Sequence, residues 1–275
     1  MEFPKGGILG KALRCLRKIQ KMGIPGHAAN AGYFLVVSVF PALVLLLSIL
    51  RYTDLDAGDL LRFLDGVIPQ ALMGTAEKLI VSTYAQTSRM VISLSALGAL
   101  WSASRGIYGV LVGLNAIYGV QEDRGYWYTR GISVVYTFGF LTLLLLTLIL
   151  NIFGEALLDM LADSPAFLWQ LLSRAVNLRF FLLLLLQTGL FVTIFMVLPN
   201  RKNSFSDSFP GAVLASLGWL IFTELFSVYV DHFRGYATIY GSVYAVALSM
   251  LWLYFCLLIL FYGGALNRLL MTKEG

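Results

Sequence analysis

The sequence contains little charge for its length. Aspartate, glutamate, lysine and arginine make up 13% of the 275 residues, whereas 59% of the residues are hydrophobic. A soluble domain is usually about a quarter charged, so this chain cannot cover a compact globule with a hydrated surface. Disorder is also excluded, because a disordered chain combines low hydrophobicity with high charge. The shortage of charge therefore predicts a protein that lies mostly within membrane lipid.

The sequence also has only two cysteines and two histidines. Cys15 and Cys256 have no partner at the spacing of a disulfide framework or a zinc site. His27 and His232 fall at opposite membrane surfaces in the arrangement derived below, so they cannot form a metal pair. The chain lacks a phosphate-binding glycine loop and the HExxH, CxxC and GxSxG motifs. We therefore expect no metal, no cofactor and no enzymatic activity.

Six long apolar stretches are present instead. Each is about 20 residues or longer, which is the length that a helix needs to cross the hydrocarbon of a bilayer. They lie at residues 31–50, 91–118, 131–153, 180–198, 210–230 and 242–266. Strands are excluded because the stretches lack the alternation of a membrane barrel, and backbone groups in lipid must bond within their own segment. The sequence predicts an all-α polytopic membrane protein, a bundle of six transmembrane helices. Pro41 removes a backbone hydrogen bond and predicts a kink in the first helix.

Lysine and arginine are distributed unevenly between the two sides of these spans. The side that carries both termini holds twelve basic residues and five acids, whereas the opposite side holds seven basic residues and nine acids. Basic residues concentrate on the cytoplasmic side of membrane proteins. The pattern predicts a multi-pass protein with both termini in the cytoplasm. The net charge of +5 follows from this topology, and we expect no nucleic-acid partner because no binding motif for one is present.

Three further segments complete the predicted organisation around a transmembrane domain at residues 29–268. Residues 1–28 place apolar residues at helical spacing between lysines and arginines, which is typical of an amphipathic helix on the cytoplasmic membrane surface. A cleaved signal peptide is the rival interpretation, but the segment lacks a continuous apolar region and a cleavage site. Residues 51–89 have helical periodicity and are expected to cap the bundle on its outer face. Residues 269–275 form a cytoplasmic tail.

Arg105 is an ionisable residue inside a predicted span, where charge is costly and usually functional. At helical spacing it aligns with Ser102, Gly109 and Gly113. Small residues let two membrane helices approach closely. We therefore expect this face, including the Arg105 side chain, to point into the bundle.

Glu224 is the matching acid in the fifth span, where it aligns with Ser227 and Asp231. Two interpretations of Arg105 and Glu224 are open. In the structural one, which we favour, they form a buried ion pair that fixes the register of two helices. In the functional one, these residues, with Ser102 and Ser227, line a polar cavity that binds an anionic head group or couples to ion movement.

Three groups of residues resemble a known family. The first group runs from His27 to Pro41 and contains HAANAGYF and SVFP. The second runs from Leu97 to Tyr118 and contains LGALWSASR and LNAIY. The third begins at Leu198 with LPNRK and continues with FPGA, FSVY, IYGS, LWLY and GGALN. Over nearly its whole length the chain is similar to the YihY/BrkB family of bacterial inner-membrane proteins, once labelled ribonuclease BN-like. Asn30 and Gly32 depart from the small apolar residues typical of the opening motif.

The resemblance implies a six-span protein of the bacterial inner membrane, whose relatives have been discussed as transporters of lipid-linked envelope molecules. Together with the intramembrane charges, it favours a transporter or flippase-like protein whose partner is a lipid-linked or anionic small molecule of the envelope. A non-transporting scaffold that organises the envelope is the alternative. A ribonuclease follows from the old label alone, and no residue of the sequence supports it.

Overall fold

The fold is described from a computed structural model of the chain. It describes residues 17–50, 89–152, 179–232 and 235–271, together with Gly58, Glu77 and Lys78. All regular secondary structure in these residues is helical, so the predicted all-α class is confirmed. Most of the predicted surface helix, most of the outer segment 51–89 and the end of the tail lie outside the described residues.

Six long helices make up the described part of the chain. They are α2 (Ile24–Leu50), α5 (Arg89–Tyr118), α6 (Tyr126–Ile152), α9 (Arg179–Val197), α10 (Phe205–His232) and α11 (Gly235–Met271). Each helix overlaps one of the predicted spans. Within the described residues, four segments are long and apolar enough to cross a membrane, at Ala96–Tyr118, Phe180–Val197, Phe205–Val230 and Val246–Met271.

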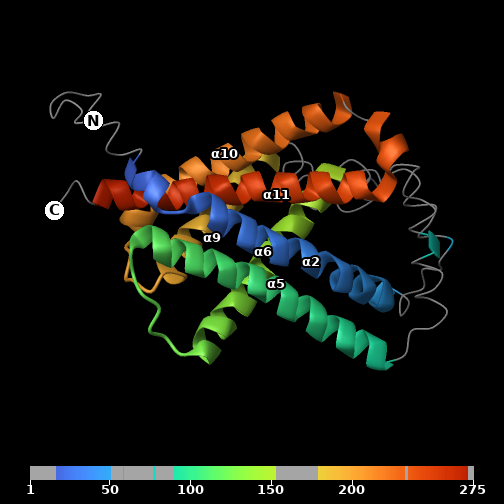
Figure 1. The fold of residues 1–275 in the computed structure, drawn as a ribbon, viewed down its shortest axis with the longest axis horizontal. Coiled ribbons are helices and arrows are strands. Elements are labelled where there is room, and N and C mark those ends of the chain that lie inside the picture. The colour runs from blue at the N-terminus through green and yellow to red at the C-terminus, as the bar shows by residue number, and fades with distance from the viewer. Residues whose placement is uncertain are drawn as a thin grey trace, which may run out of the picture.

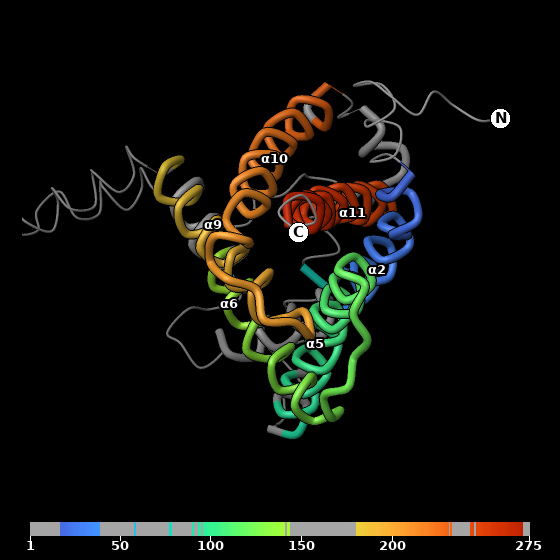
Figure 2. Tube along the Cα trace, turned by 90° about the vertical axis from the view of Figure 1, so that its left-hand side faces the viewer, coloured from blue at the N-terminus to red at the C-terminus, as the bar shows by residue number. Residues whose placement is uncertain are grey.

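The helices are arranged around α11. Helices α2, α5 and α11 run side by side, and α2 begins where α11 ends (Figure 1). We call this end of the bundle the terminal end. Viewed along the bundle, α2, α5 and α10 surround α11, while α9 packs against α10, and α6 packs against α5 and α9 (Figure 2). The side of the membrane on which the terminal end lies stays a prediction.

Close approach of backbones holds α2 against α5. A Cβ atom added to Gly109 would lie 3.0 Å from the Cα atom of Ala31, and one added to Gly106 would overlap Leu35. One added to Gly113 would lie 2.6 Å from the ring of Phe261 on α11. Without a hydrophobic driving force between helices in lipid, such close packing is a main source of helix association. The glycines of α5 therefore form its contact face.

Local signals set the helix ends at the terminal end. Helix α5 stops because Gly119 adopts a φ of 70°, and the amide of Val120 turns back to donate to the carbonyl of Asn115 at 3.0 Å. Helix α10 starts with a capping box, in which the Ser204 hydroxyl accepts the Asp207 amide at 3.2 Å and the Asp207 carboxylate accepts the Ser204 amide at 3.1 Å. These ends fix where the connecting loops leave the bundle.

An aromatic cluster joins four of the helices deeper in the bundle. The ring of Trp219 on α10 lies 6.1 Å from Phe140 on α6, 5.6 Å from Phe191 on α9 and 5.8 Å from Trp252 on α11, measured between ring centroids. Offset and edge-on contacts of this kind add to the dispersion energy of packing. The cluster connects α6 and α9 to the pair formed by α10 and α11.

Candidate functional site

Arg105 is exposed on α5, so the prediction that it points into the bundle is wrong for the described structure. Its guanidinium carbon lies 5.0 Å from the centre of the Phe34 ring on α2. The neighbouring Gly106 and Gly109 face α2 instead. Because successive helical residues are about 100° apart, the arginine falls at the edge of the interface that the glycines make. Ser102 is half-buried.

Glu224 and Ser227 are exposed on α10, and Asp231 lies in the last turn of the same helix. Among the described residues, the structure forms no ion pair between Glu224 and Arg105. The favoured buried pair is therefore not the arrangement that these residues adopt. A polar cavity lined by them stays a prediction.

Helix α2 is continuous through Pro41, and the predicted kink there stays a prediction. A second proline, Pro210, lies inside α10 near its start. Next to it, the Gly211 amide donates to Oδ1 of Asn267 at 2.6 Å, and Nδ2 of Asn267 donates to the Ser208 carbonyl at 3.1 Å. The side chain of Asn267 on α11 thus pairs with backbone groups in the turn around a proline.

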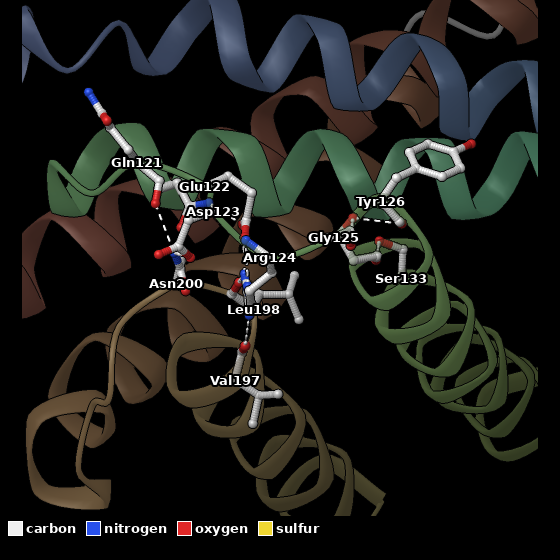
Figure 3. Close-up of polar contacts among 12 residues, drawn as sticks. Gln121, Glu122, Asp123, Arg124, Gly125, Tyr126, Ser133, Val197, Leu198 and Asn200 are labelled. Atoms are coloured by element: carbon white, nitrogen blue, oxygen red, sulfur yellow. Dashed lines mark hydrogen bonds and ion pairs between the residues drawn. The ribbon is translucent and has the colours of Figure 1, made fainter.

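A polar network at the terminal end ties the loop after α5 to the end of α9 (Figure 3). Nε of Arg124 lies 2.7 Å from a carboxylate oxygen of Glu122, and its Nη2 donates to the Leu198 carbonyl at 2.6 Å. Asn115 donates to Glu122 at 2.7 Å and accepts the amide of Asn200 at 2.7 Å. The bonds of Asn115 and of Arg124 to Leu198 join separate loops and helix ends, and the Arg124–Glu122 pair lies within one loop, which indicates a structural network.

The pKa of Glu122 lies below its usual value because Arg124, and secondly Asn115, donate hydrogen bonds to its carboxylate. Glu122→Gln is therefore expected to lower the stability near pH 7 by about 1 kcal/mol, a small value because solvent screens this partly exposed pair. A depressed folded-state pKa adds stability above the unfolded pKa, and this stability is lost as the pH falls through the folded pKa. Thermal unfolding of both proteins at decreasing pH should show their difference closing in acid. A difference that is constant with pH would contradict the assignment.

The sequence interpretation missed a buried polar stripe on α6. Its members are at most 7% exposed and lie three or four residues apart, except for the adjacent first two: Thr129, Arg130, Ser133 and Thr137. The hydroxyls of Ser133 and Thr137 donate to carbonyls one turn earlier in their own helix, whereas Arg130 reaches α5. The predicted span began at residue 131, so Arg130 counted as a loop charge. The periodicity of the polar residues could have shown that it belongs to the helix.

Arg130 contacts Trp101 on α5 in two ways. Its Nη2 donates to the Trp101 carbonyl at 3.0 Å, and its guanidinium carbon lies 4.1 Å from the centre of the indole ring. Both are favourable contacts for a cation. Because Trp101 lies within the apolar segment Ala96–Tyr118, the first turn of α6 lies beside the interior of α5 and not beside its end.

An open apolar groove of about 550 Å³ lies between α6 and α9. It is lined by Trp127, Tyr128, Gly131, Ile132, Val135, Tyr136 and Val197. In the residues that the structure describes, no three side chains of histidine, cysteine, aspartate or glutamate come together as a group that could hold a metal. The described side chains that could contact a ligand are therefore separate cations, hydroxyls and aromatic rings.

Residues 15–274 match the family described as Virulence factor BrkB. The chain is 30% identical over 247 residues to YfkH of Bacillus subtilis strain 168, whose name describes it as ribonuclease-like, and the match covers 90% of each chain. It is also 30% identical over 90 residues to a UPF0761 membrane protein of Vibrio vulnificus strain YJ016, covering 33% of this chain and 29% of the relative. A UPF0761 membrane protein of Alteromonas mediterranea is 30% identical over 157 residues, which is 55% of this chain and 49% of the relative. No solved structure matches.

Proposed function

The chain belongs to the virulence factor BrkB family, and from this premise we propose that it moves an amphiphilic or anionic envelope molecule across the bacterial inner membrane. The exposure of Arg105 and Glu224 within membrane-crossing segments carries the proposal. An ionisable side chain exposed to hydrocarbon is costly and usually faces water, another charge or a polar ligand. Since these two residues do not pair with each other, each needs such a partner, and a molecule with a polar headgroup supplies one.

The proposed orientation places the terminal end of the bundle in the cytoplasm. Arg124, Arg201, Lys202 and Arg268 lie in the loops and helix ends there. Basic residues concentrate on the cytoplasmic side of membrane proteins, so their position supports this orientation. The polar network around Glu122 and Arg124 also suits an aqueous surface, because its members are partly exposed.

Movement of a labelled anionic lipid tests the proposal. The purified chain is reconstituted in vesicles that contain a fluorescent phosphatidylglycerol, and a quencher that cannot cross the bilayer reports transfer between leaflets. We expect the wild type to speed transfer and Arg105→Gln or Glu224→Gln to slow it at least about fivefold, a loss of about 1 kcal/mol in activation free energy. Arg201→Gln, which removes an exposed cation in a loop, is the matched control and should transfer like the wild type.

A scaffold that organises other envelope proteins is the second candidate. It is favoured by the solid packing near the terminal end, where Leu114, Phe195, Leu198 and Phe261 are fully buried. The transfer assay separates the two functions. If the wild type does not speed transfer of any lipid class while a partner stays bound through purification, the scaffold replaces the transporter. If transfer is fast in both charge variants, Arg105 and Glu224 have no role in it.

A further inference from the structure

Arg130 is a buried cation that no acid of the described residues pairs with. Its side chain is 7% exposed, and within the described part of the chain it forms no ion pair. Its Nε has no hydrogen-bond partner, while Nη2 donates to the carbonyl of Trp101. A guanidinium cannot lose its charge by deprotonation in a protein, so burial carries a cost of desolvation that the contacts with Trp101 offset only in part. Such a residue is either strained or is the receptor for an anion.

The surroundings of Arg130 favour the anion. The indole of Trp101 lies against the guanidinium and is itself 53% exposed on α5. Arg105 follows Trp101 by four residues, so its side chain lies one helical turn away on the same exposed face. Trp101 thus contacts Arg130 and lies one turn from Arg105, and neither arginine pairs with an acid among the described residues. Cations that have no acid to pair with attract a negatively charged group.

We propose that Arg130 binds the phosphate of an anionic lipid headgroup that enters from the bilayer when the Trp101 ring swings aside, with Arg105 one helical turn from that ring on α5. Arginine suits this ligand because its planar fork bonds two phosphate oxygens at once, and the free Nε is one edge of that fork. The exposed ring provides the entrance from the membrane. The inference rests on the proposed function, from which it takes the class of ligand, an anionic envelope molecule. It adds the residues that recognise the headgroup of that ligand.

Chemical modification of the native chain gives the first test. Phenylglyoxal, which reacts with arginine, is added to the full-length protein in nanodiscs of phosphatidylcholine, with or without phosphatidylglycerol, and the modified arginines are identified by peptide mass spectrometry. Phosphatidylglycerol should slow the modification of Arg130 at least about threefold and leave that of Arg201 unchanged. Trp101→Ala should speed the modification of Arg130 in phosphatidylcholine, because the ring no longer covers it. Equal rates at Arg130 in the two lipid mixtures would overturn the proposal.

Lipid retention gives the second test. After transfer from mixed nanodiscs to detergent, native mass spectrometry counts the phosphatidylglycerol molecules that remain bound. Arg130→Gln should retain at least about fivefold fewer than the wild type, Arg130→Lys an intermediate number, and Arg201→Gln the wild-type number. Wild-type retention by Arg130→Gln would overturn the proposal. If inorganic phosphate protects Arg130 from phenylglyoxal in pure phosphatidylcholine as well as the lipid does, the ligand is a soluble phosphate and the lipid assignment fails.

These tests do not depend on movement of the lipid. Protection and retention measure binding at equilibrium, whereas the vesicle assay measures transfer between leaflets. A chain that binds phosphatidylglycerol through Arg130 but does not transfer it keeps this site and loses the transport function. A chain that transfers lipid equally well with Arg130→Gln, and whose Arg130 the lipid does not protect, keeps the function and loses this site.

Discussion

Replacing Gly211 by alanine is expected to separate α10 from α11 at the terminal end. A Cβ atom added there would overlap the carbonyl oxygen of Gly263 and would lie 2.5 Å from Oδ1 of Asn267. The first neighbour is backbone, so no change of rotamer can relieve the contact. We expect Gly211→Ala to lower the stability by about 3 kcal/mol, at the upper end of the usual cost of overpacking. Thermal unfolding in detergent, followed by the loss of monodisperse protein, measures this.

Gly189→Ala is the matched control for that experiment. Gly189 is also a helical glycine, on α9, but it is exposed and an added Cβ would have no neighbour within 4 Å. Alanine is the better helix former by about 1 kcal/mol, so this variant should be as stable as the wild type or slightly more stable. If Gly211→Ala unfolds at the same temperature as Gly189→Ala, the two backbones do not pack as closely as described.

The six helices could be predicted from the sequence because length and apolar composition alone identify them. Their ends could not. Helix α11 continues past the apolar stretch to Met271, since Asn267 and Arg268 are helical although they are polar. Helix α6 similarly begins at Tyr126, before the apolar run. A helix can continue through polar residues where another segment of the chain supplies hydrogen-bond partners for their side chains. A hydropathy pattern does not show which segment that is.

The orientation of Arg105 was not predictable for a related reason. Helical spacing correctly grouped Gly109 and Gly113 on a contact face, and both approach residues outside α5 closely. The same spacing placed Arg105 with them, although the neighbouring helix covers only part of that face. Which residues at the edge of an interface are covered depends on the width and the crossing angle of the partner helix. A single helix in isolation does not specify either.

The network at the terminal end depends on contacts between distant parts of the sequence. Arg124 bonds the carbonyl of Leu198, 74 residues further along, and Arg268 donates to the carbonyl of Ile117. In the sequence these arginines only indicated topology. In the structure they also satisfy backbone carbonyls where helices end, which explains how short polar loops can hold the ends of six helices together. The basic residues of this end therefore stabilise the bundle, in addition to being the basis of its predicted orientation.

Asn267→Leu is expected to have the second large effect, because Asn267 is fully buried and both ends of its amide are used. Leucine is close to asparagine in size but leaves the Gly211 amide and the Ser208 carbonyl without these partners. Each buried unpaired group costs about 1–3 kcal/mol, so we expect a loss of about 3 kcal/mol in stability.

Asn30→Leu is the matched control, since Asn30 is an exposed asparagine on α2 and leucine there should be neutral or stabilising. Thermal unfolding of the two variants in the same detergent compares them. Equal melting temperatures would show that the amide of Asn267 does not hold α10 to α11, and other contacts, such as those of Gly211 with Gly263 and of Trp219 with Trp252, would then hold the crossing.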